Sequence, residues 1–321
     1  MASTKSTFTL GAGLSFLGAA GALLLVGACS PLTAINTMSP KDGYVHYEAL
    51  AYGMQPRQKL DVYVPVEGKP PYRVVVFFYG GGWKSGSKDR DLPSFPTRRS
   101  SDLLAARGFV TVIPDYRVFP EVTFPAFIAD SAAAVRWAHN NIADFGGDLD
   151  QMFLMGHSAG AFNAAMISVN PAYLAAEGLT PAIIRGVVGI AGPYAFNPLQ
   201  YSSTRPIFEG AGDGEATQPV TFVDQGAPAM LLLHGLDDGT VKPVNSRRMA
   251  KRLKQAGAEA TLVEYRGLGH YLIVAALAAP FQGDGGIMDA AAAFMRGEPV
   301  PVPAHGRLNT TFSAEGSNPP S

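Results

Sequence analysis

The sequence predicts an α/β fold in which helices flank a mostly parallel central sheet. Short and almost continuous apolar runs alternate with segments whose apolar residues recur every three or four positions. Such runs suit strands that are buried on both faces, and their alternation with helices is typical of βαβ units. The composition agrees, because 47% of the 321 residues are hydrophobic and 16% are charged, which is an ordinary globular balance.

The predicted strands comprise an opening pair followed by six apolar runs. They span residues 44–47 and 59–64, then 73–79, 109–113, 152–155, 184–190, 230–233 and 260–265. The helices predicted between and after them span residues 127–142, 159–169, 244–256 and 287–296. We expect the folded domain to cover residues 42–297. Residues 29–41 then form a linker, and the polar, Pro-rich residues 298–321 form a disordered tail.

Residues 1–28 have the layout of a secretory signal, because one positive side chain precedes an apolar run of small residues. The run ends in Val-Gly-Ala followed by Cys29, the one cysteine of the chain. This ending resembles the bacterial lipobox, whose cysteine is acylated. We therefore expect an exported protein that is anchored in the membrane by lipid on Cys29. Ser30 resembles the signal for the periplasmic side of the outer membrane. A plain secreted protein and a short spanning helix are the alternatives.

One segment interrupts the pattern of strands and helices. Residues 95–103 stand where a helix should follow the first core strand, but they carry no apolar stripe before Leu103. Their string, Phe-Pro-Thr-Arg-Arg-Ser-Ser-Asp-Leu, resembles the translation of a sequencing-library adapter. Our hypothesis is that the segment is an artefact of the gene sequence. A genuine basic loop is the alternative, and resequencing the locus distinguishes the two.

The pentapeptide Gly156-His157-Ser158-Ala159-Gly160 lies between a predicted strand and a predicted helix. A serine hydroxyl is a weak nucleophile at neutral pH, so it needs an adjacent base and an exposed position on a tight turn. The Gly-x-Ser-x-Gly pattern provides such a turn, and the following helix N-terminus adds free backbone N–H groups. We therefore predict that Ser158 is the nucleophile of a serine hydrolase.

Three successive glycines, Gly80 to Gly82, follow the first apolar run. Their backbone N–H groups would lie at the carboxyl edge of the sheet, where open α/β folds bind ligands. We expect the N–H of Ala159, together with that of Gly81 or Gly82, to stabilise a developing oxyanion. A phosphate-binding loop is the alternative, but the Gly-Lys-Ser/Thr ending of such loops is missing here.

These motifs resemble the α/β-hydrolase superfamily and, within it, the bacterial carboxylesterase-like group with feruloyl-esterase-type (BD-FAE-like) domains. The resemblance covers about residues 42–296. Besides the two glycine motifs, it rests on residues 112–117, 124–127, 147–148, 192–194, 218–219, 234–235 and 267–277. It departs at the adapter-like segment and at Tyr79, which replaces the histidine of the HGGG oxyanion motif. The resemblance implies hydrolysis of carboxylic esters through an acyl-enzyme, without a cofactor.

In this fold the nucleophile is followed along the chain by the acid and then by the histidine. His270 follows the last long predicted strand and is the expected base, whereas His234 precedes the candidate acids and His305 lies in the tail. The family pattern His-Gly-x-x-Asp-x-x-Val places the acid at Asp238, with Asp237 as the alternative. The acid would hold the correct tautomer of the histidine.

The substrate is less well defined by the sequence. Trp83 and Tyr194 are the predicted walls of an apolar acyl or aryl pocket, beneath a small cap formed by residues 196–228. An ordinary place in the core is the alternative for each of them. We expect short acyl chains, because no large lid insertion is visible. The alternatives are an amide hydrolase, such as an arylformamidase, and a surface lipoprotein that has lost catalysis.

Composition excludes several other classes of function. The net charge is −1 and no basic stretch carries interleaved aromatic residues, so nucleic acid is not an expected partner. The six histidines and one cysteine show no metal-ligand spacing. We expect a small ester as substrate and no metal or other cofactor, and the oligomeric state stays open.

Overall fold

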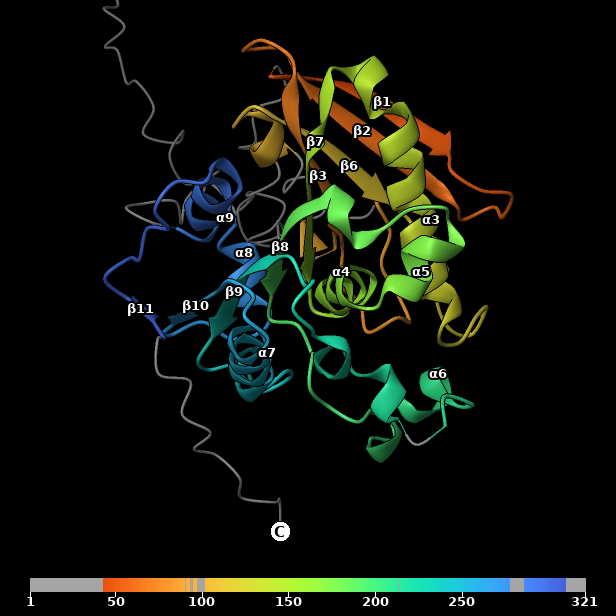
Figure 1. Cartoon of the computed structure of the whole chain (residues 1–321), viewed down its shortest axis with the longest axis vertical. Coiled ribbons are helices and arrows are strands. Elements are labelled where there is room, and N and C mark those ends of the chain that lie inside the picture. Colours follow the sequence, from red (N-terminus) through yellow and green to blue (C-terminus); the bar gives the residue numbers. More distant parts are fainter. Residues whose placement is uncertain are drawn as a thin grey trace, which may run out of the picture. The chain divides into compact units, whose positions relative to one another are not determined.

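The structure is a computed structural model that describes residues 43–89, 91–92, 95–96, 102–212, 214–277 and 286–309. Among these residues, nine strands form one sheet in the order β1-β2-β6-β3-β7-β8-β9-β10-β11 (Figure 1). The strands from β6 to β10 pair in parallel, whereas β1, β2 and β11 pair antiparallel with their neighbours. The predicted mostly parallel sheet is therefore confirmed.

The strands have the following bounds. They are β1 (Tyr44–Ala51), β2 (Lys59–Pro65), β3 (Tyr72–Phe78), β6 (Phe109–Pro114), β7 (Gly147–His157), β8 (Ile184–Ile190), β9 (Ala229–Gly235), β10 (Ala260–Tyr265) and β11 (Gly306–Leu308). A separate two-stranded ladder joins β4 (Asp91–Leu92) to β5 (Phe95–Pro96). The six predicted apolar runs all become strands, because each buries its side chains on both faces of the sheet.

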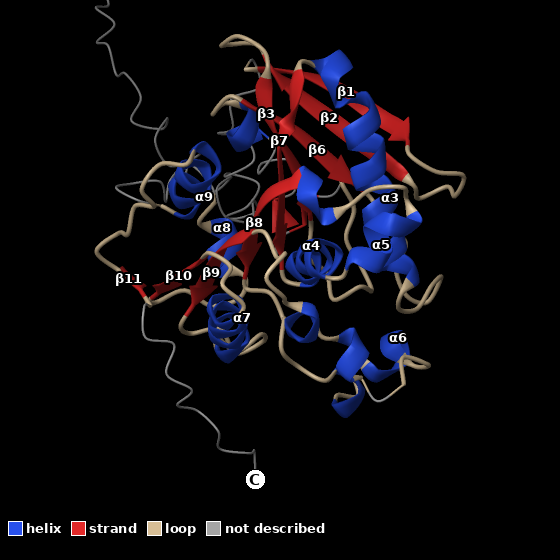
Figure 2. Cartoon of the chain, in the orientation of Figure 1, coloured by secondary structure: helices blue, strands red, loops and turns tan. Residues whose placement is uncertain are grey.

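Helices cover both faces of the sheet (Figure 2). They are α3 (Ala126–Asn141), α4 (Ala159–Val169), α5 (Pro171–Ala176), α6 (Arg205–Phe208), α7 (Val244–Gln255), α8 (Leu272–Ala275) and α9 (Ile287–Arg296). Short 3-10 turns span Ile142–Phe145, Pro181–Ile183, Pro198–Gln200, Glu215–Thr217 and Pro219–Phe222. The helix α4 is buried at all 11 of its residues, which fits its lack of polar side chains on any one stripe.

The predicted helices and strands differ from the observed ones mainly at their ends. The strand β7 begins five residues earlier than the predicted run at 152–155, because Gly147 pairs with Tyr72 of β3 across an irregular register. The helix α4 has the predicted bounds. Of the suspected adapter segment, residues 97–101 lie outside the described residues, and residues 102–105 are helical with Leu103 buried.

The disordered tail predicted from Glu298 begins too early. Residues 298–309 are described, and β11 within them extends the sheet beside β10. The side chain of Glu264 on β10 is fully buried, and its oxygens accept hydrogen bonds from Arg307 at 3.0 and 2.8 Å, from Asn309 at 2.9 Å and from Arg247 at 2.7 Å. The polar composition concealed this strand because charge pairing, rather than apolar side chains, holds it.

The other predicted boundaries fall outside the described residues. The signal at 1–28 with Cys29, the linker at 29–41 and the tail beyond Asn309 all lie there. Within the described part, the helices are either too short or too polar to cross a lipid bilayer.

We expect Glu264→Gln to lower the free energy of unfolding by about 2 kcal/mol at pH 7, because a buried carboxylate then loses charged partners. Burial alone would raise the pKa of Glu264, but hydrogen bonds from Asn309 and Arg247 and the nearby guanidinium charges hold it below 4.5. A depressed carboxyl pKa stabilises the folded state above the unfolded-state pKa, and the benefit is lost as the pH falls through the folded-state pKa. Urea denaturation between pH 7 and pH 3 should therefore show the difference shrinking below about pH 4.5.

The matched control is Glu259→Gln, since Glu259 is exposed just before the same strand. Its free energy of unfolding should stay within about 0.5 kcal/mol of wild type. A loss of equal size at both positions, or a difference that grows towards low pH, would show that the Glu264 ion pairs do not hold β11.

Candidate active site

Ser158 occupies a strained turn between β7 and α4. Its backbone has φ 53° and ψ −121°, a conformation that a non-glycine residue rarely adopts. The flanking glycines make the turn possible. A Cβ at Gly160 would overlap the carbonyl oxygens of Phe78 and Tyr79, and a Cβ at Gly156 would overlap the backbone of Gly160. The missing side chains let the turn sit directly against the end of β3.

Three of the predicted residues come together at this turn. His270 Nε2 lies 2.9 Å from Ser158 Oγ, and His270 Nδ1 lies 2.7 Å from Asp238 Oδ2. All three residues are buried, with exposed fractions of 8% for Ser158, 5% for His270 and 4% for Asp238. Neutral His270 therefore donates from Nδ1 to the carboxylate and accepts at Nε2 from the hydroxyl. This is the hydrogen-bond arrangement of a Ser-His-Asp triad.

The geometry separates the two candidate acids. Asp238 Oδ1 accepts the backbone N–H groups of Thr240 and Val241 at 2.9 and 2.8 Å, which leaves Oδ2 for His270. Asp237 is exposed, and its backbone N–H donates to the carbonyl oxygen of Leu268 at 3.1 Å. The acid that faces the histidine is therefore Asp238.

His234, which the sequence analysis set aside as a base, supports the acid. It is fully buried, and its Nε2 lies 2.7 Å from the Val241 carbonyl and 3.4 Å from Asp238 Oδ2. Burial alone would raise the pKa of Asp238, but hydrogen bonds from His234 and His270 hold that pKa well below its ordinary value. Asp238 thus stays ionised over the whole neutral range. The only hint in the sequence was the position of His234 at the end of a strand.

His157 is a second supporting residue that the sequence analysis missed. It is fully buried, and its ring centre lies 4.8 Å from that of His270. Burial and the neighbouring His270 hold the pKa of His157 well below its usual value, so the ring is neutral at neutral pH. Its Nε2 lies 3.1 Å from the carbonyl oxygen of His270, and a donated N–H there holds the backbone of the histidine loop.

The glycine loop lies beside the serine turn. It follows β3, the turn follows β7, and these two strands are parallel neighbours in which Phe78 pairs with Gly156. Gly81 and Gly82 have φ angles of 119° and 60°, which favour glycine. The N–H of Ala159 belongs to the first turn of α4 and so has no partner within the helix. The predicted donors Gly81, Gly82 and Ala159 therefore share one edge of the sheet with Ser158.

The structure corrects the predicted pocket residues. Trp83 is 2% exposed, and its indole Nε1 donates to Asn163 at 3.0 Å while its ring packs on Phe162 and Phe208. Tyr194 is fully buried, with its ring over Gly189 and Gly192, where any Cβ would overlap it. Both side chains are core residues. The sequence could not decide between pocket and core at these two positions, because burial depends on packing from distant segments.

The predicted cap, residues 196–228, folds into short helices and turns between β8 and β9. Its residue Phe208 is fully buried among aromatic rings of the core, including those of Trp83, Phe124 and Phe127. At least this part of the segment is anchored in the domain core.

A cavity of about 780 Å³ lies away from the triad. It is lined by Arg73, Arg185 and Ala229, which stand at the amino ends of β3, β8 and β9. Ser158 and the glycine loop lie at the opposite, carboxyl edge, so this cavity is separate from the triad. Within the described residues, no group of three His, Cys, Asp or Glu side chains could hold a metal ion.

Comparison with known proteins places these features in a family. The BD-FAE family model matches residues 60–253. A probable isoprenylcysteine alpha-carbonyl methylesterase, ICME, of Oryza sativa subsp. japonica is 32% identical over 242 residues, which are 69% of this chain and 57% of that protein. Esterase LipC of Mycobacterium tuberculosis is 30% identical over 250 residues, covering 71% of this chain and 60% of LipC. The chain thus spans a little over half the length of these relatives.

Solved structures confirm the α/β-hydrolase fold. A truncated carbohydrate esterase from gut microbiota has a TM-score of 0.66 at 21% identity, covering 81% of this chain and 98% of that one. Esterase 2 of Thermogutta terrifontis, phosphoramylated by tabun, has a TM-score of 0.59 at 27% identity, covering 72% of this chain and 86% of that one.

We expect Gly160→Ala to disrupt the serine turn, because the new methyl group would overlap two backbone carbonyls that cannot move independently of β3. The free energy of unfolding should fall by about 3 kcal/mol, and Ser158 should move out of reach of His270. Urea denaturation and the rate of fluorophosphonate labelling measure the two effects.

Gly43→Ala is the control, since a Cβ at Gly43 meets no atom within 4 Å. It should leave stability and labelling unchanged. If Gly160→Ala behaves like Gly43→Ala, the close approach of the turn to β3 is not what fixes Ser158.

Proposed function

The chain belongs to the BD-FAE family, and we propose that it is a serine esterase that cleaves carboxylic esters of small acyl or aryl substrates. One observation carries this proposal. The line of hydrogen bonds from Ser158 Oγ through His270 to Asp238 is continuous, at 2.9 and 2.7 Å. The names of the relatives support it, because they include a methylesterase and an esterase.

In the proposed first half-reaction, His270 Nε2 takes the hydroxyl proton as Ser158 Oγ attacks the ester carbonyl. Asp238 stabilises the imidazolium that forms, and its depressed pKa keeps it ionised for this role. The N–H groups of Ala159 and of Gly81 or Gly82 bind the developing oxyanion. Collapse of the tetrahedral intermediate breaks the ester C–O bond, and His270 returns the proton to the departing alcohol.

In the second half-reaction a water molecule attacks the acyl-Ser158 carbonyl and gives a proton to His270. The tetrahedral intermediate collapses, the acid is released, and the proton returns to Ser158 Oγ. The same groups therefore serve both halves. The strained turn at Ser158 keeps Oγ at the sheet edge in each of them.

We expect Ser158→Ala to abolish labelling by a fluorophosphonate probe and to lower the hydrolysis of p-nitrophenyl esters by about 10⁴-fold or more. In-gel fluorescence and initial rates measure the two outcomes, and Ser203→Ala, at an exposed serine, is the control. No label on the wild type, or undiminished label on Ser158→Ala, would contradict the proposal. Including N-formyl amides among the substrates tests ester against amide preference.

The acid is tested within the same assay by a matched pair of neighbouring variants. Asp238→Asn should lower kcat by about 10⁴-fold, because an amide favours the wrong tautomer of His270. Asp237→Asn, at an exposed aspartate, should lower it by less than about twofold. The opposite ranking would assign the acid to Asp237.

We also propose that the chain is exported and anchored to the periplasmic side of the outer membrane through lipid on Cys29. The support is the sequence alone, namely the apolar run that ends in Val-Gly-Ala-Cys and the absence of any other cysteine. Two or more acyl chains would give stable attachment, whereas one gives only reversible binding.

Metabolic labelling with an alkyne fatty acid tests this anchor in a Gram-negative host that expresses the full chain. Wild type and Ser158→Ala should carry label and sediment with membranes. Cys29→Ala should carry no label. Label that persists on Cys29→Ala, or wild-type protein without label, would contradict the anchor.

A further inference from the structure

The glycine loop at residues 80–82 has no side chains of its own to hold it. The carbonyl of Gly81 accepts the backbone N–H groups of Lys84 and Ser85 at 3.1 and 3.2 Å and the Ser85 hydroxyl at 3.3 Å. Glycine loses more conformational freedom than any other residue when it is fixed. An oxyanion site needs its donors aimed before the reaction begins. Groups outside the loop must therefore fix its two stems, Tyr79 before the glycines and residues 83–88 after them.

Arg57, in the turn before β2, reaches both stems with one guanidinium. Its Nη2 donates to Tyr79 Oη at 3.0 Å and to the carbonyl of Gly86, and its Nε donates to the carbonyl of Tyr116 at 2.6 Å. Tyr79 and Gly86 lie in close contact, since a Cβ at Gly86 would overlap the tyrosine ring. One cation thus ties together the segments that enter and leave the glycine loop.

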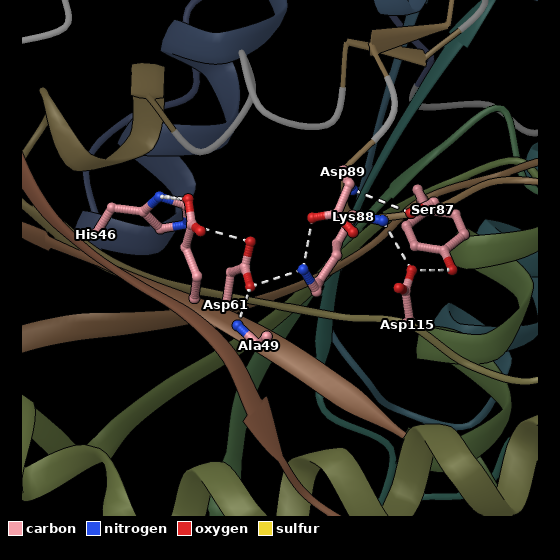
Figure 3. Close-up of polar contacts among 9 residues, drawn as sticks. His46, Ala49, Asp61, Ser87, Lys88, Asp89 and Asp115 are labelled. Carbon is pink, nitrogen blue, oxygen red and sulfur yellow. Dashed lines mark hydrogen bonds and ion pairs between the residues drawn. The ribbon is translucent and has the colours of Figure 1, made fainter. Parts of the chain in front are cut away.

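Asp115, directly after β6, holds the same two stems from the other side. Its Oδ1 accepts the Tyr79 hydroxyl at 2.7 Å and the backbone N–H of Lys88 at 2.7 Å (Figure 3). The carboxylate is 8% exposed. A phenol is both a donor and an acceptor, so Tyr79 can donate to Asp115 while it accepts from Arg57. Burial raises the pKa of Tyr79 well above its usual value, which keeps the phenol protonated for this double role.

Tyr116 adds a further bond on the first stem. Its hydroxyl donates to the carbonyl oxygen of Tyr79 at 2.8 Å, and the two rings stack with centres 4.9 Å apart. Both tyrosines are buried. The backbone and the side chain of Tyr79 are therefore fixed separately, directly before Gly80.

Lys88 ties the second stem to the edge of the sheet. Its side chain is 5% exposed, and its Nζ lies 2.9 Å from Asp61 Oδ1 on β2 (Figure 3). Asp61 also accepts the N–H of Ala49 at 2.8 Å and contacts His46 Nε2 at 3.1 Å, both on β1. The far end of the loop stem is thus anchored in two strands that lie outside the predicted site.

We propose that Arg57 and Asp115 are positioning residues that clamp the two stems of the glycine loop and so aim its N–H groups at the reacting carbonyl. The proposal rests on the proposed esterase function. Both residues act through Tyr79 and residues 86–88.

Removing the clamp should weaken binding of the transition state more than binding of the substrate. For Arg57→Ala we expect kcat on a p-nitrophenyl ester to fall by about 10- to 100-fold, which is less than the loss of a whole oxyanion donor, with KM changed less than about threefold. Affinity for a trifluoromethyl ketone, which forms an oxyanion on the nucleophile, should fall by a similar factor. Methylguanidine in solution should restore part of the rate.

Tyr79→Phe should reproduce most of this loss, because it keeps the ring but removes the hydroxyl that both clamp residues contact. The double variant Arg57→Ala/Tyr79→Phe should be little worse than either single variant, since residues that act as one unit are not additive.

Arg117→Ala is the matched control for stability. Arg117 also makes a half-buried ion pair, but its guanidinium donates to Asp130, at 2.8 and 2.9 Å, rather than to the stems of the glycine loop. The variant Arg117→Ala should lower the melting temperature without changing kcat. If Arg57→Ala lowers kcat no more than Arg117→Ala does, or changes KM alone, the proposed positioning role of the clamp is wrong.

Hydrogen exchange tests the clamp without relying on ester turnover. A peptide that covers residues 79–89 should exchange faster in Arg57→Ala than in wild type or in Arg117→Ala, because Tyr79 Oη and the Gly86 carbonyl lose the guanidinium that joins the two stems. Unchanged exchange would overturn the clamp even if Ser158 proves to be the nucleophile. The two proposals can also fail separately in the other direction. If exchange is faster in Arg57→Ala but the Ser158→Ala test shows that the chain is not an esterase, the clamp is supported and only the proposed function is wrong.

Discussion

The contact between Gly160 and the carbonyl oxygens at the end of β3 is the constraint on which the candidate site depends. Without a Cβ at Gly160, the serine turn packs directly on Phe78 and Tyr79, so Ser158 and the glycine loop meet at one edge of the sheet. The strained backbone at Ser158 costs about 1–3 kcal/mol. Burial of all 11 residues of α4 offsets that cost many times over. Packing of the helix thus holds the nucleophile in a conformation that the turn would not adopt on its own.

Two buried carboxylates, Asp238 and Asp115, hold different parts of the candidate site, each with its own set of partners. Asp238 has two histidines and two backbone N–H groups, whereas Asp115 has a phenol, a backbone N–H and a nearby guanidinium. A buried charge without partners would be neutralised or expelled. Each carboxylate therefore fixes the groups around it. The first orients the base, and the second fixes the stems of the loop that carries the oxyanion donors.

The sequence predicted the features that depend on local pattern and failed where distant packing decides. Apolar runs gave the parallel strands, and the pentapeptide gave the serine turn. The family pattern favoured Asp238 but left Asp237 open, because it does not show the hydrogen bonds from Thr240 and Val241 that leave one Asp238 oxygen for His270. Trp83 was misplaced in a pocket because the rings that bury it come from α3, α4 and α6. The strand β11 was missed because its Arg307 pairs with the buried Glu264 of β10, a contact that no apolar pattern announces.

The sheet topology explains why a residue as remote in sequence as Arg57 reaches the glycine loop. The strand β2 runs antiparallel to β6, so Leu60 near its start pairs with Pro114 at the end of β6. The backbone N–H of Asp115 donates to the carbonyl of Lys59 at 2.8 Å, which joins the two segments directly. The turn that carries Arg57 therefore lies at the carboxyl edge of the parallel strands, beside the loop after β3. A parallel strand in the place of β2 would put that turn at the opposite edge, too far away to hold the loop.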